Sequence, residues 1–466
     1  MADQFFTVDE LVKMTKGKLL QKQDSFVYGI STDSRTIQKG DLFIPLKGEN
    51  FDGHDYVAQV VEKGAAAALV SQDLKEKVGI TLIKVDDTLK ALQDMGSSYR
   101  HAYPFKIIGI TGSNGKTTTK FFTEKILSQQ FRTYASQKSF NNHFGVPLTL
   151  LALKPDTQFG IVEIGMNHAG EISALTKMAD PDIALVTTVG RAHLMDFDGV
   201  EGIAKEKSDI YRKSRGDNIK VFNLDNDSTA EMYREFKGQG HAITFSSVKK
   251  DVDVHFELKE MGLEHLRITG AIKGVPGEVV IPVFGAHNVI NLMGAAGIAL
   301  AAGMTPENIW SALPSCQTVW GRNMLVHLKS KANLIFDGYN ANPDSMKALV
   351  DNLSQLTVDG KKIVILGDML EMGEQADELH SELGEFIGRK GFEVVWFLGQ
   401  FSKSFEAGIK KSQYSKNLFI SNGYEESLAV KVASMVEPSD IVVMKGSRGA
   451  RLEKLVPHFQ PVNWNV

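Results

Sequence analysis

The chain contains a single cysteine, Cys316. An intrachain disulfide is therefore excluded, which favours a reducing compartment over an extracellular one. No basic residue flanks Cys316 in Pro-Ser-Cys-Gln-Thr-Val-Trp, so nothing nearby in the sequence would stabilise a reactive thiolate. We expect a buried or half-buried thiol without a catalytic role.

An excess of basic residues is also missing. Lys and Arg total 52, against 56 Asp and Glu, which gives a formal charge of -4. A chain that binds nucleic acid or an anionic membrane surface usually carries a marked basic excess. We therefore expect neither partner, although a local pocket could still bind a small anion.

Long apolar runs of the kind that cross a membrane are absent as well. Residues 279–306 contain no Asp, Glu, Lys or Arg, but they include Pro282, His287 and two asparagines among many Gly and Ala. A spanning helix needs about 20 predominantly apolar residues, so this stretch predicts a strand, a polar turn and a tightly packed helix. The first residues lack a basic segment followed by an apolar core, so no secretory signal is expected. We expect a cytoplasmic protein.

What is present is an ordinary globular composition, with 43% hydrophobic and 23% charged residues. At about 150 residues per domain, 466 residues suggest three domains. Changes in the pattern of apolar residues place the boundaries near residues 100 and 315. The predicted units are residues 1–100, 101–314 and 315–466.

The apolar pattern predicts an α/β fold. Short strand-like pieces and a helix-like run over residues 56–68 precede a break at Tyr103-Pro104. Buried strands then alternate with helices from residue 106 and again from about residue 320, which is typical of parallel sheets covered on both faces. Between residues 252 and 283 the period changes to two, which indicates antiparallel strands or hairpins.

A phosphate-binding loop is predicted at residues 111–118, Thr-Gly-Ser-Asn-Gly-Lys-Thr-Thr, between a buried strand and a helix. Gly112 and Gly115 would let the backbone approach phosphate oxygens, and the helix N-terminus offers free N–H groups. Lys116 can reach the β- and γ-phosphates, and the Thr117 hydroxyl can bind Mg²⁺. The two glycines enclose only two residues, so the loop is a shortened variant of the common motif. The alternative is a glycine turn with a surface lysine.

Three further residues are candidates for a metal site. Glu163 ends an apolar strand, where a carboxylate must be paired, protonated or bound to metal, so a metal role and a structural ion pair both stay open. His193 follows another strand and could be a ligand or an ordinary loop histidine. Lys207, on a predicted helix over residues 201–211, would by itself be taken for a surface lysine.

The chain resembles the Mur ligases of bacterial cell-wall synthesis, in particular those that add D-alanyl-D-alanine. The resemblance spans nearly the whole chain, in family order. Its segments are residues 112–118 (Gly-Ser-Asn-Gly-Lys-Thr-Thr), 141–149 (Asn-Asn-His-Phe-Gly-Val-Pro-Leu-Thr), 163–172 (Glu-Ile-Gly-Met-Asn-His-Ala-Gly-Glu-Ile), 337–346 (Asp-Gly-Tyr-Asn-Ala-Asn-Pro-Asp-Ser-Met), 366–373 (Leu-Gly-Asp-Met-Leu-Glu-Met-Gly) and 445–448 (Lys-Gly-Ser-Arg).

The resemblance implies an N-terminal α/β domain for the UDP end of the substrate, a central P-loop ATPase domain with a parallel sheet and a small antiparallel one, and a C-terminal Rossmann-like domain. It implies an ATP-dependent and ADP-forming ligase that joins D-alanyl-D-alanine to UDP-N-acetylmuramoyl-tripeptide through an acyl phosphate. The sequence itself leaves the oligomeric state open, and nothing in it suggests more than a monomer. Two Mg²⁺ ions would assist.

The resemblance also implies roles for individual residues. ATP would contact Gly112, Ser113, Asn114, Gly115, Lys116, Thr117, Thr118, His287, Asn288, Asn291, Arg322 and Asp337. Mg²⁺ would be held by Thr117, Glu163, His193 and Lys207, with Lys207 carried as a carbamate. The substrate would contact Ser34, Arg35, Lys47 and Asn142, together with the rest of residues 47–54. Lys116, Glu163, His193 and Lys207 would form the catalytic centre.

One departure from the family pattern follows His193, where Leu-Met-Asp-Phe-Asp-Gly replaces the usual Leu-Glu and Gly-Ser. The spacing from His193 to Lys207 is kept, and Lys205, on another side of the helix, is the fallback. A folylpolyglutamate synthase, another Mur ligase or a P-loop switch protein are the alternatives. The sequence leaves open whether the third peptide residue of the substrate is diaminopimelate or lysine.

Overall fold

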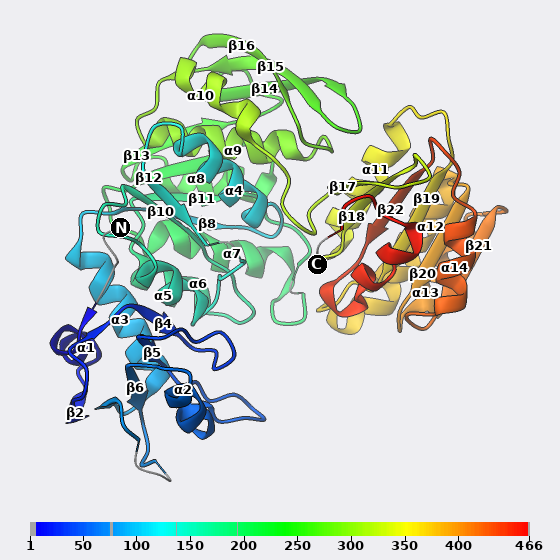
Figure 1. Cartoon of the computed structure of the whole chain (residues 1–466). Helices are drawn as coiled ribbons and strands as arrows, with labels where there is room; N and C mark the ends of the chain where they lie inside the picture. Colours follow the sequence, from blue (N-terminus) through cyan, green and yellow to red (C-terminus); the bar gives the residue numbers. More distant parts are fainter. Residues whose placement is uncertain (1–5, 75–77, 137, 193, 465–466) are drawn as a thin grey trace.

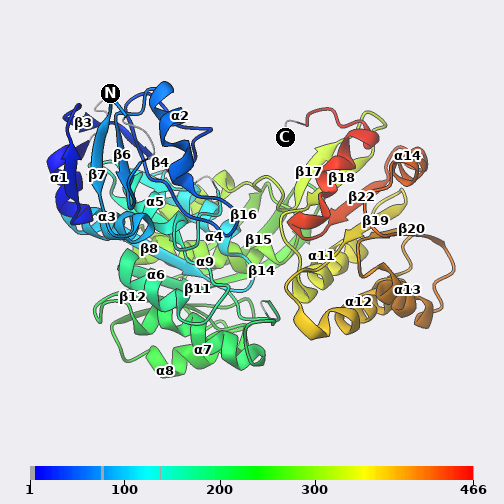
Figure 2. The ribbon, with the colours of Figure 1, turned by 90° about the horizontal axis from the view of Figure 1, so that it is seen from below.

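The computed structural model describes residues 6–74, 78–136, 138–192 and 194–464 of the chain. Its strands form three large sheets and one short two-stranded sheet. The N-terminal and C-terminal sheets lie against different sides of the central part (Figures 1 and 2). The α/β class predicted from the sequence is confirmed.

The N-terminal sheet has five strands in the order β2-β7-β6-β5-β4, with β2 antiparallel to its neighbour and the others parallel. A short antiparallel pair, β1 and β3, lies beside it. The strands are β1 (Phe6–Thr7), β2 (Lys18–Gln21), β3 (Phe26–Val27), β4 (Gly29–Ser31), β5 (Asp41–Phe43), β6 (Ala67–Val70) and β7 (Thr81–Lys84), and the helices are α1 (Val8–Thr15), α2 (Val57–Glu62) and α3 (Thr88–Ala102).

The helix expected over residues 56–68 is shorter than predicted. It ends at Glu62, and Gly64 adopts φ +91°, a left-handed conformation that terminates helices and favours glycine. Of the four alanines that follow, Ala67 and Ala68 begin strand β6, which is buried along its whole length. Alanine favours helices intrinsically, but burial between two neighbouring strands decides the outcome here.

The central sheet has nine strands in the order β16-β15-β14-β13-β12-β11-β8-β10-β9. Strands β8 to β14 run parallel to one another, and β15 and β16 extend the same sheet through the antiparallel pairs β14–β15 and β15–β16. The strands are β8 (Lys106–Thr111), β9 (Thr133–Ala135), β10 (Phe159–Glu163), β11 (Ile183–Val186), β12 (Ile219–Asn223), β13 (His241–Phe245), β14 (Val254–Met261), β15 (Leu266–Ile272) and β16 (Val275–Ile281).

Helices cover both faces of the central sheet because neighbouring side chains of a strand point to opposite faces. Ile108 packs with the helices of one face and Ile107 with those of the other. The first face carries α4 (Lys116–Leu127), α9 (Asn288–Ala301) and α10 (Pro306–Ala312), and the second carries α5 (Gly145–Leu151), α6 (Glu171–Ala179), α7 (Gly199–Arg212) and α8 (Asp227–Phe236).

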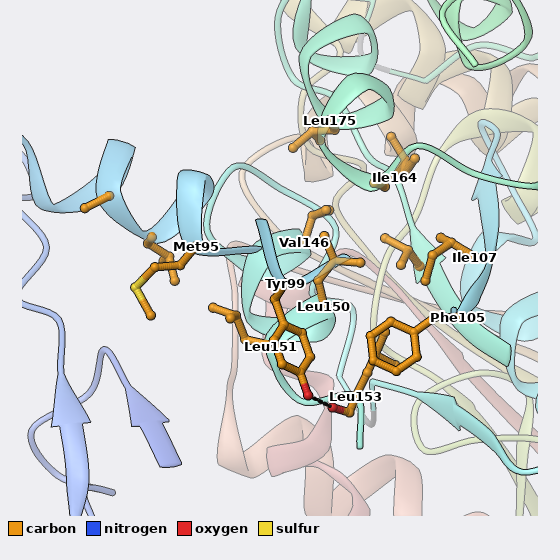
Figure 3. Packing of buried hydrophobic residues seen from close by; sticks show 14 of the residues in the cluster. Met95, Tyr99, Phe105, Ile107, Val146, Leu150, Leu151, Leu153, Ile164 and Leu175 are labelled. Atoms are coloured by element: carbon orange, nitrogen blue, oxygen red, sulfur yellow. Dashed lines mark hydrogen bonds between the residues drawn. The ribbon is translucent and has the colours of Figure 1, made fainter. Parts of the chain in front are cut away.

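The core of the second face continues into the N-terminal sheet through α3. Met95 and Tyr99 of α3 lie beside Val146 and Leu150 of α5, and the Tyr99 hydroxyl donates to the Leu153 carbonyl at 2.7 Å (Figure 3). One hydrophobic cluster therefore spans the N-terminal and central parts, and each part also has a cluster of its own.

The C-terminal sheet has six strands in the order β17-β18-β22-β19-β20-β21, with only β17 antiparallel. The strands are β17 (Met324–His327), β18 (Asn333–Asp337), β19 (Lys362–Gly367), β20 (Val394–Leu398), β21 (Asn417–Ser421) and β22 (Ile441–Lys445). The helices are α11 (Pro343–Gln355), α12 (Ala376–Lys390), α13 (Ser402–Lys411) and α14 (Glu426–Ser434).

Residues 279–306 form the end of β16, a turn and the packed helix α9, as the sequence predicts. No helix among the described residues is long and apolar enough to cross a membrane. Cys316 is buried, and this burial raises the pKa of its thiol far above the usual value, which suits a structural rather than a reactive cysteine.

Candidate active site

A cavity of about 360 Å³ lies between the central and C-terminal sheets. Every predicted nucleotide-binding residue except Gly112 and Asn288 lines it. The central part contributes the loop of residues 113–118, His287 and Asn291, and the C-terminal part contributes Arg322 and Asp337. Segments more than 200 residues apart in the sequence therefore meet at one cavity.

The predicted phosphate loop connects β8 to α4 at the carboxyl edge of the parallel sheet. Gly112 and Gly115 adopt φ +149° and +82°. A Cβ on Gly112 would collide with the Thr187 hydroxyl, and one on Gly115 with the Asn291 amide oxygen, so only glycine fits at either position. The Lys116 ammonium folds back over the loop and donates to the Gly112 carbonyl at 2.7 Å. Burial lowers the pKa of Lys116, and the negative charge of Glu163 opposes that change.

Glu163 ends β10, the strand next to β8, and is only 1% exposed. Its Oε2 accepts a hydrogen bond from the Thr117 hydroxyl at 3.0 Å, and its Oε1 accepts one from the Asn141 amide at 2.9 Å. The Lys120 ammonium lies 3.7 Å from Oε2. Of the two roles left open for Glu163, the structure shows the structural ion pair, with Lys120. The role as a metal ligand stays a prediction.

Lys207 is buried on α7, with 1% of its surface exposed, so the surface-lysine interpretation is wrong. Its ammonium makes no hydrogen bond or ion pair with another residue in the described part of the chain. Burial lowers the pKa of Lys207 well below its usual value, and the charge of Lys116 lowers it further. Lys205 is exposed on another side of the helix. His193 lies outside the described residues.

The C-terminal side of the cavity is formed by the carboxyl ends of two neighbouring strands. Asp337 ends β18 and Lys445 ends β22, and their side chains form a buried ion pair at 2.5 Å. The Lys445 ammonium also donates to the Asn340 carbonyl at 3.1 Å. Arg322 stacks over the Tyr339 ring at 4.4 Å, and its Nε is a buried donor with no partner among the described atoms. Such a donor suits an anionic or polar ligand in the cavity.

His287 connects the two sides of the cavity. Its Nδ1 lies 2.8 Å from the Asn352 amide nitrogen, and the Asn352 amide oxygen accepts from the Ala286 N–H at 3.1 Å. Nδ1 therefore accepts a hydrogen bond, which places the proton of the neutral ring on Nε2. Nε2 lies 2.8 Å from the Asn323 side-chain nitrogen, and the Asn323 side-chain oxygen is buried without a partner among the described atoms. Exchanging the oxygen and nitrogen of this amide gives the protonated Nε2 its acceptor. Burial lowers the pKa of His287 to about 4.

Direct contacts also join the phosphate loop to the C-terminal part. Asn114 and Asn342 exchange side-chain amide hydrogen bonds of 3.4 and 2.8 Å. Asn342 caps the N-terminus of α11, and Asp344 in the first turn accepts from the Arg191 backbone N–H at 3.0 Å. These contacts fix the first turn of α11 in the lining of the cavity.

Several residues around the cavity had not been predicted. Asn342 and Asp344 lie inside segment 337–346, and Lys445 opens segment 445–448. Both segments carry the family resemblance, so the sequence gave a signal although no role was assigned to these residues. Asn323, Asn352 and Asn226 gave none. These residues are Asn226, Asn323, Asn342, Asp344, Asn352 and Lys445.

The predicted substrate residues Ser34, Arg35, Lys47 and Asn142 do not line this cavity. Arg35 is exposed and pairs with Asp33 at 2.7 Å, which lowers the pKa of Asp33 to about 2. Asn142 accepts from the Gly145 N–H at 3.0 Å, at the start of α5. His54, at the end of the predicted substrate segment, lines a separate cavity of about 180 Å³.

The sequence of the chain matches the models of a known protein family. Residues 26–100, 110–299 and 321–448 match the descriptions "Mur ligase family, catalytic domain", "Mur ligase middle domain" and "Mur ligase, glutamate ligase domain", respectively. The UDP-N-acetylmuramoyl-tripeptide–D-alanyl-D-alanine ligase of Bacillus subtilis is 34% identical over 97% of both chains, and that of Escherichia coli is 31% identical over 97% of this chain and 98% of its own.

Solved structures show the same similarity over the whole chain. MurF from Acinetobacter baumannii superposes with a TM-score of 0.88 at 31% identity, covering 98% of this chain and 99% of its own. MurF ligase from Thermotoga maritima, solved in complex with ADP, superposes with a TM-score of 0.77 at 25% identity, covering 92% and 96%. The chain belongs to the Mur ligase family.

Proposed function

We infer that this chain is an ATP-dependent, ADP-forming ligase that joins D-alanyl-D-alanine to UDP-N-acetylmuramoyl-tripeptide, a step in peptidoglycan synthesis. Its full-length similarity to ligases named for this reaction supports the inference. The observation that carries it is the cavity between the phosphate loop and the ends of β18 and β22. A P-loop switch protein would not require the C-terminal residues at that place.

We propose that ATP occupies this cavity. Its phosphates would lie on the N–H groups of residues 112–118 and against Lys116, which now bonds the Gly112 carbonyl and would turn to the phosphates. His287, Asn288 and Asn291 would lie against the adenine and ribose, with Asn288 acting through its hydrogen bond from Asn291 at 2.9 Å. Arg322 and Asp337 would approach from the C-terminal side.

Two Mg²⁺ ions are proposed beside the phosphates. The described residues contain no cluster of three His, Cys, Asp or Glu side chains that could hold a metal by themselves. That pattern fits Mg²⁺, which usually takes one or two protein carboxylates and completes its shell with phosphate oxygens and water. The Thr117 hydroxyl oxygen and Glu163 Oε2 lie 3.0 Å apart and could both bind one Mg²⁺ ion. His193 would bind the second ion. When bound, the ions would neutralise charge on the transferred phosphoryl group.

Lys207 is proposed to carry a carbamate. A carbamate forms from a neutral amine and CO₂, and the lowered pKa of this buried lysine favours the neutral amine. As an ammonium, Lys207 would sit near Lys116 and repel the cations. As a carbamate it would supply anionic oxygen, so the charge of the site favours the modified form.

The reaction then follows from positioning and charge. The terminal carboxylate of the tripeptide attacks the γ-phosphorus of ATP, giving an acyl phosphate and ADP. The amine of D-alanyl-D-alanine attacks the acyl carbon, and phosphate leaves from the tetrahedral intermediate. Closure of the C-terminal part over the phosphate loop, supported by the Asn114–Asn342 contact, would keep water from the acyl phosphate.

We propose that the UDP end lies on the N-terminal sheet, near Ser34, Arg35, Lys47 and Asn142. The positive charge of Lys138, in the central part, helps to lower the pKa of Asp33, next to Arg35. The proposed domains are residues 1–100, 101–314 and 315–466, with the first boundary in the last turn of α3. A cytoplasmic monomer is also proposed, to be checked by size-exclusion chromatography with light scattering.

The test is phosphate release from ATP, measured with both substrates, with each alone and with neither. The proposal predicts release only when UDP-N-acetylmuramoyl-tripeptide and D-alanyl-D-alanine are both present, in step with formation of a pentapeptide product. Substrate-independent ATP hydrolysis with no pentapeptide would instead indicate a P-loop hydrolase or switch protein.

A further inference from the structure

Lys120 is a fully buried lysine to which the proposed reaction assigns no role. It lies on α4 one helical turn after Lys116 and is 0% exposed. A buried ammonium is costly unless its donors and its charge are both compensated. Its partners therefore indicate its function.

The three donors of the Lys120 ammonium go to the loop that follows β9. Nζ donates to the Ser136 carbonyl at 2.7 Å, to the Lys138 carbonyl at 2.9 Å and to the Ser136 hydroxyl at 3.2 Å. Lysine has three donors and no acceptor, so these bonds satisfy it. The same loop continues to Ser139 and Asn141, which contact Thr117 and Glu163 at 3.2 and 2.9 Å.

The hydrogen bonds to the loop satisfy the donors of Lys120, whereas the negative charge of Glu163 compensates its positive charge. The Nζ–Oε2 distance of 3.7 Å is too long for a hydrogen bond but short enough for a strong electrostatic attraction in a buried site. Lys120 therefore attracts the carboxylate without using up its lone pairs. Both oxygens keep capacity for a further ligand beyond Thr117 and Asn141.

We propose that Lys120 is a positioning residue for the cation site: it fixes the loop that holds Asn141 against Glu163 and keeps that carboxylate aimed at the bound cation. This rests on the proposed role of Glu163 as a Mg²⁺ ligand. It adds that the ligand's orientation depends on a lysine that itself touches neither nucleotide nor metal. Groups that orient a metal ligand commonly change metal affinity by about 10- to 100-fold when removed.

The chain offers a matched control in Lys220. This lysine is also buried in the central part, on β12, and its ammonium donates to the Asn218 side-chain oxygen at 2.7 Å and the Gln239 carbonyl at 2.6 Å. It contacts no residue of the proposed cation site among the described residues. Loss of a buried lysine for purely structural reasons should therefore affect Lys220→Met and Lys120→Met alike.

The experiment measures Mn²⁺ binding to the full-length protein by electron paramagnetic resonance, with a non-hydrolysable ATP analogue present. Lys120→Met and Lys120→Gln should each weaken Mn²⁺ binding by about tenfold or more, while affinity for the analogue without metal stays as in the wild type. Lys220→Met should leave both affinities unchanged. Thermal unfolding confirms that each variant is folded, and Lys120→Gln keeps donors for the loop where Lys120→Met loses them.

A folded Lys120→Gln that binds Mn²⁺ as tightly as the wild type would overturn the proposal. Equal weakening in Lys220→Met would also overturn it, because the effect would then follow from destabilisation alone. Glu163→Gln separates this inference from the proposed function. If Glu163→Gln binds Mn²⁺ normally, the cation role of Glu163 is wrong; if it binds weakly while both Lys120 variants bind normally, only the positioning role is wrong.

Discussion

Acidification should destabilise the protein through His287. Burial lowers the pKa of this ring to about 4, against about 6.5 in an unfolded chain. Because the folded pKa is the lower one, His287 contributes stability above pH 6.5, and that contribution is lost as the pH falls towards 4. Protonating Nδ1 would also break the hydrogen bond that it accepts from Asn352.

The size of the effect follows from the two pKa values. Between about pH 7.5 and about pH 5 the folded state should lose about 2 kcal/mol of unfolding free energy from this group, and about 3 kcal/mol once the pH lies below both values. Urea unfolding of the wild type and of His287→Gln at the two pH values measures this loss. The other histidines are present in both proteins, so the difference between the two isolates the contribution of His287. Over this pH change the free energy of unfolding of His287→Gln should fall by about 2 kcal/mol less than that of the wild type.

Two results would refute this reasoning. One is an equal loss of stability in wild type and His287→Gln. The other is a nitrogen NMR titration in which the His287 ring protonates near pH 6.5 in the folded protein, or in which Nδ1 rather than Nε2 carries the proton at neutral pH.

Three further outcomes are expected. Lys116→Ala should fold normally and lose ligation, because it removes a charge aimed at the phosphates from a loop; near-normal turnover would contradict the ATP site. Lys207→Ala should be inactive and regain some activity with short carboxylic acids, whereas Lys205→Ala should stay active; full activity of Lys207→Ala would exclude the carbamate. Arg100→Leu should cost about 3–5 kcal/mol in urea unfolding, because the guanidinium bonds Asp182 and three backbone carbonyls; a loss below about 1 kcal/mol would contradict it.

The sequence predicted those parts of the fold in which the burial of side chains leaves a recognisable local pattern of residues. The run Ile107–Ile110 is apolar because β8 is covered on both faces. The phosphate loop is recognisable because only glycine fits at positions 112 and 115. Strands such as β9, with three residues, and β12, which carries the buried Lys220, gave no comparable pattern. Their pairing is decided by the neighbouring strands.

The site was predictable only where a residue sits in a recognisable segment. Lys207 has the spacing of the family, yet its burial arises from packing that no local pattern shows. The ion pair of Asp337 with Lys445 depends on β18 and β22 being neighbours, although 108 residues separate the two side chains in the chain. Asn352 reaches His287 from the last turn of α11, and nothing in its surroundings in the sequence distinguishes it from a surface asparagine.

The central claim, ligation through an acyl phosphate, is tested most directly by following oxygen. The protein is supplied with ATP, D-alanyl-D-alanine and UDP-N-acetylmuramoyl-tripeptide labelled with ¹⁸O in its terminal carboxylate, and the products are analysed by mass spectrometry. The account predicts a pentapeptide that keeps one labelled oxygen in the new amide and inorganic phosphate that carries the other. Pentapeptide formed together with unlabelled phosphate, or labelled substrate recovered intact while ATP is consumed, would contradict it.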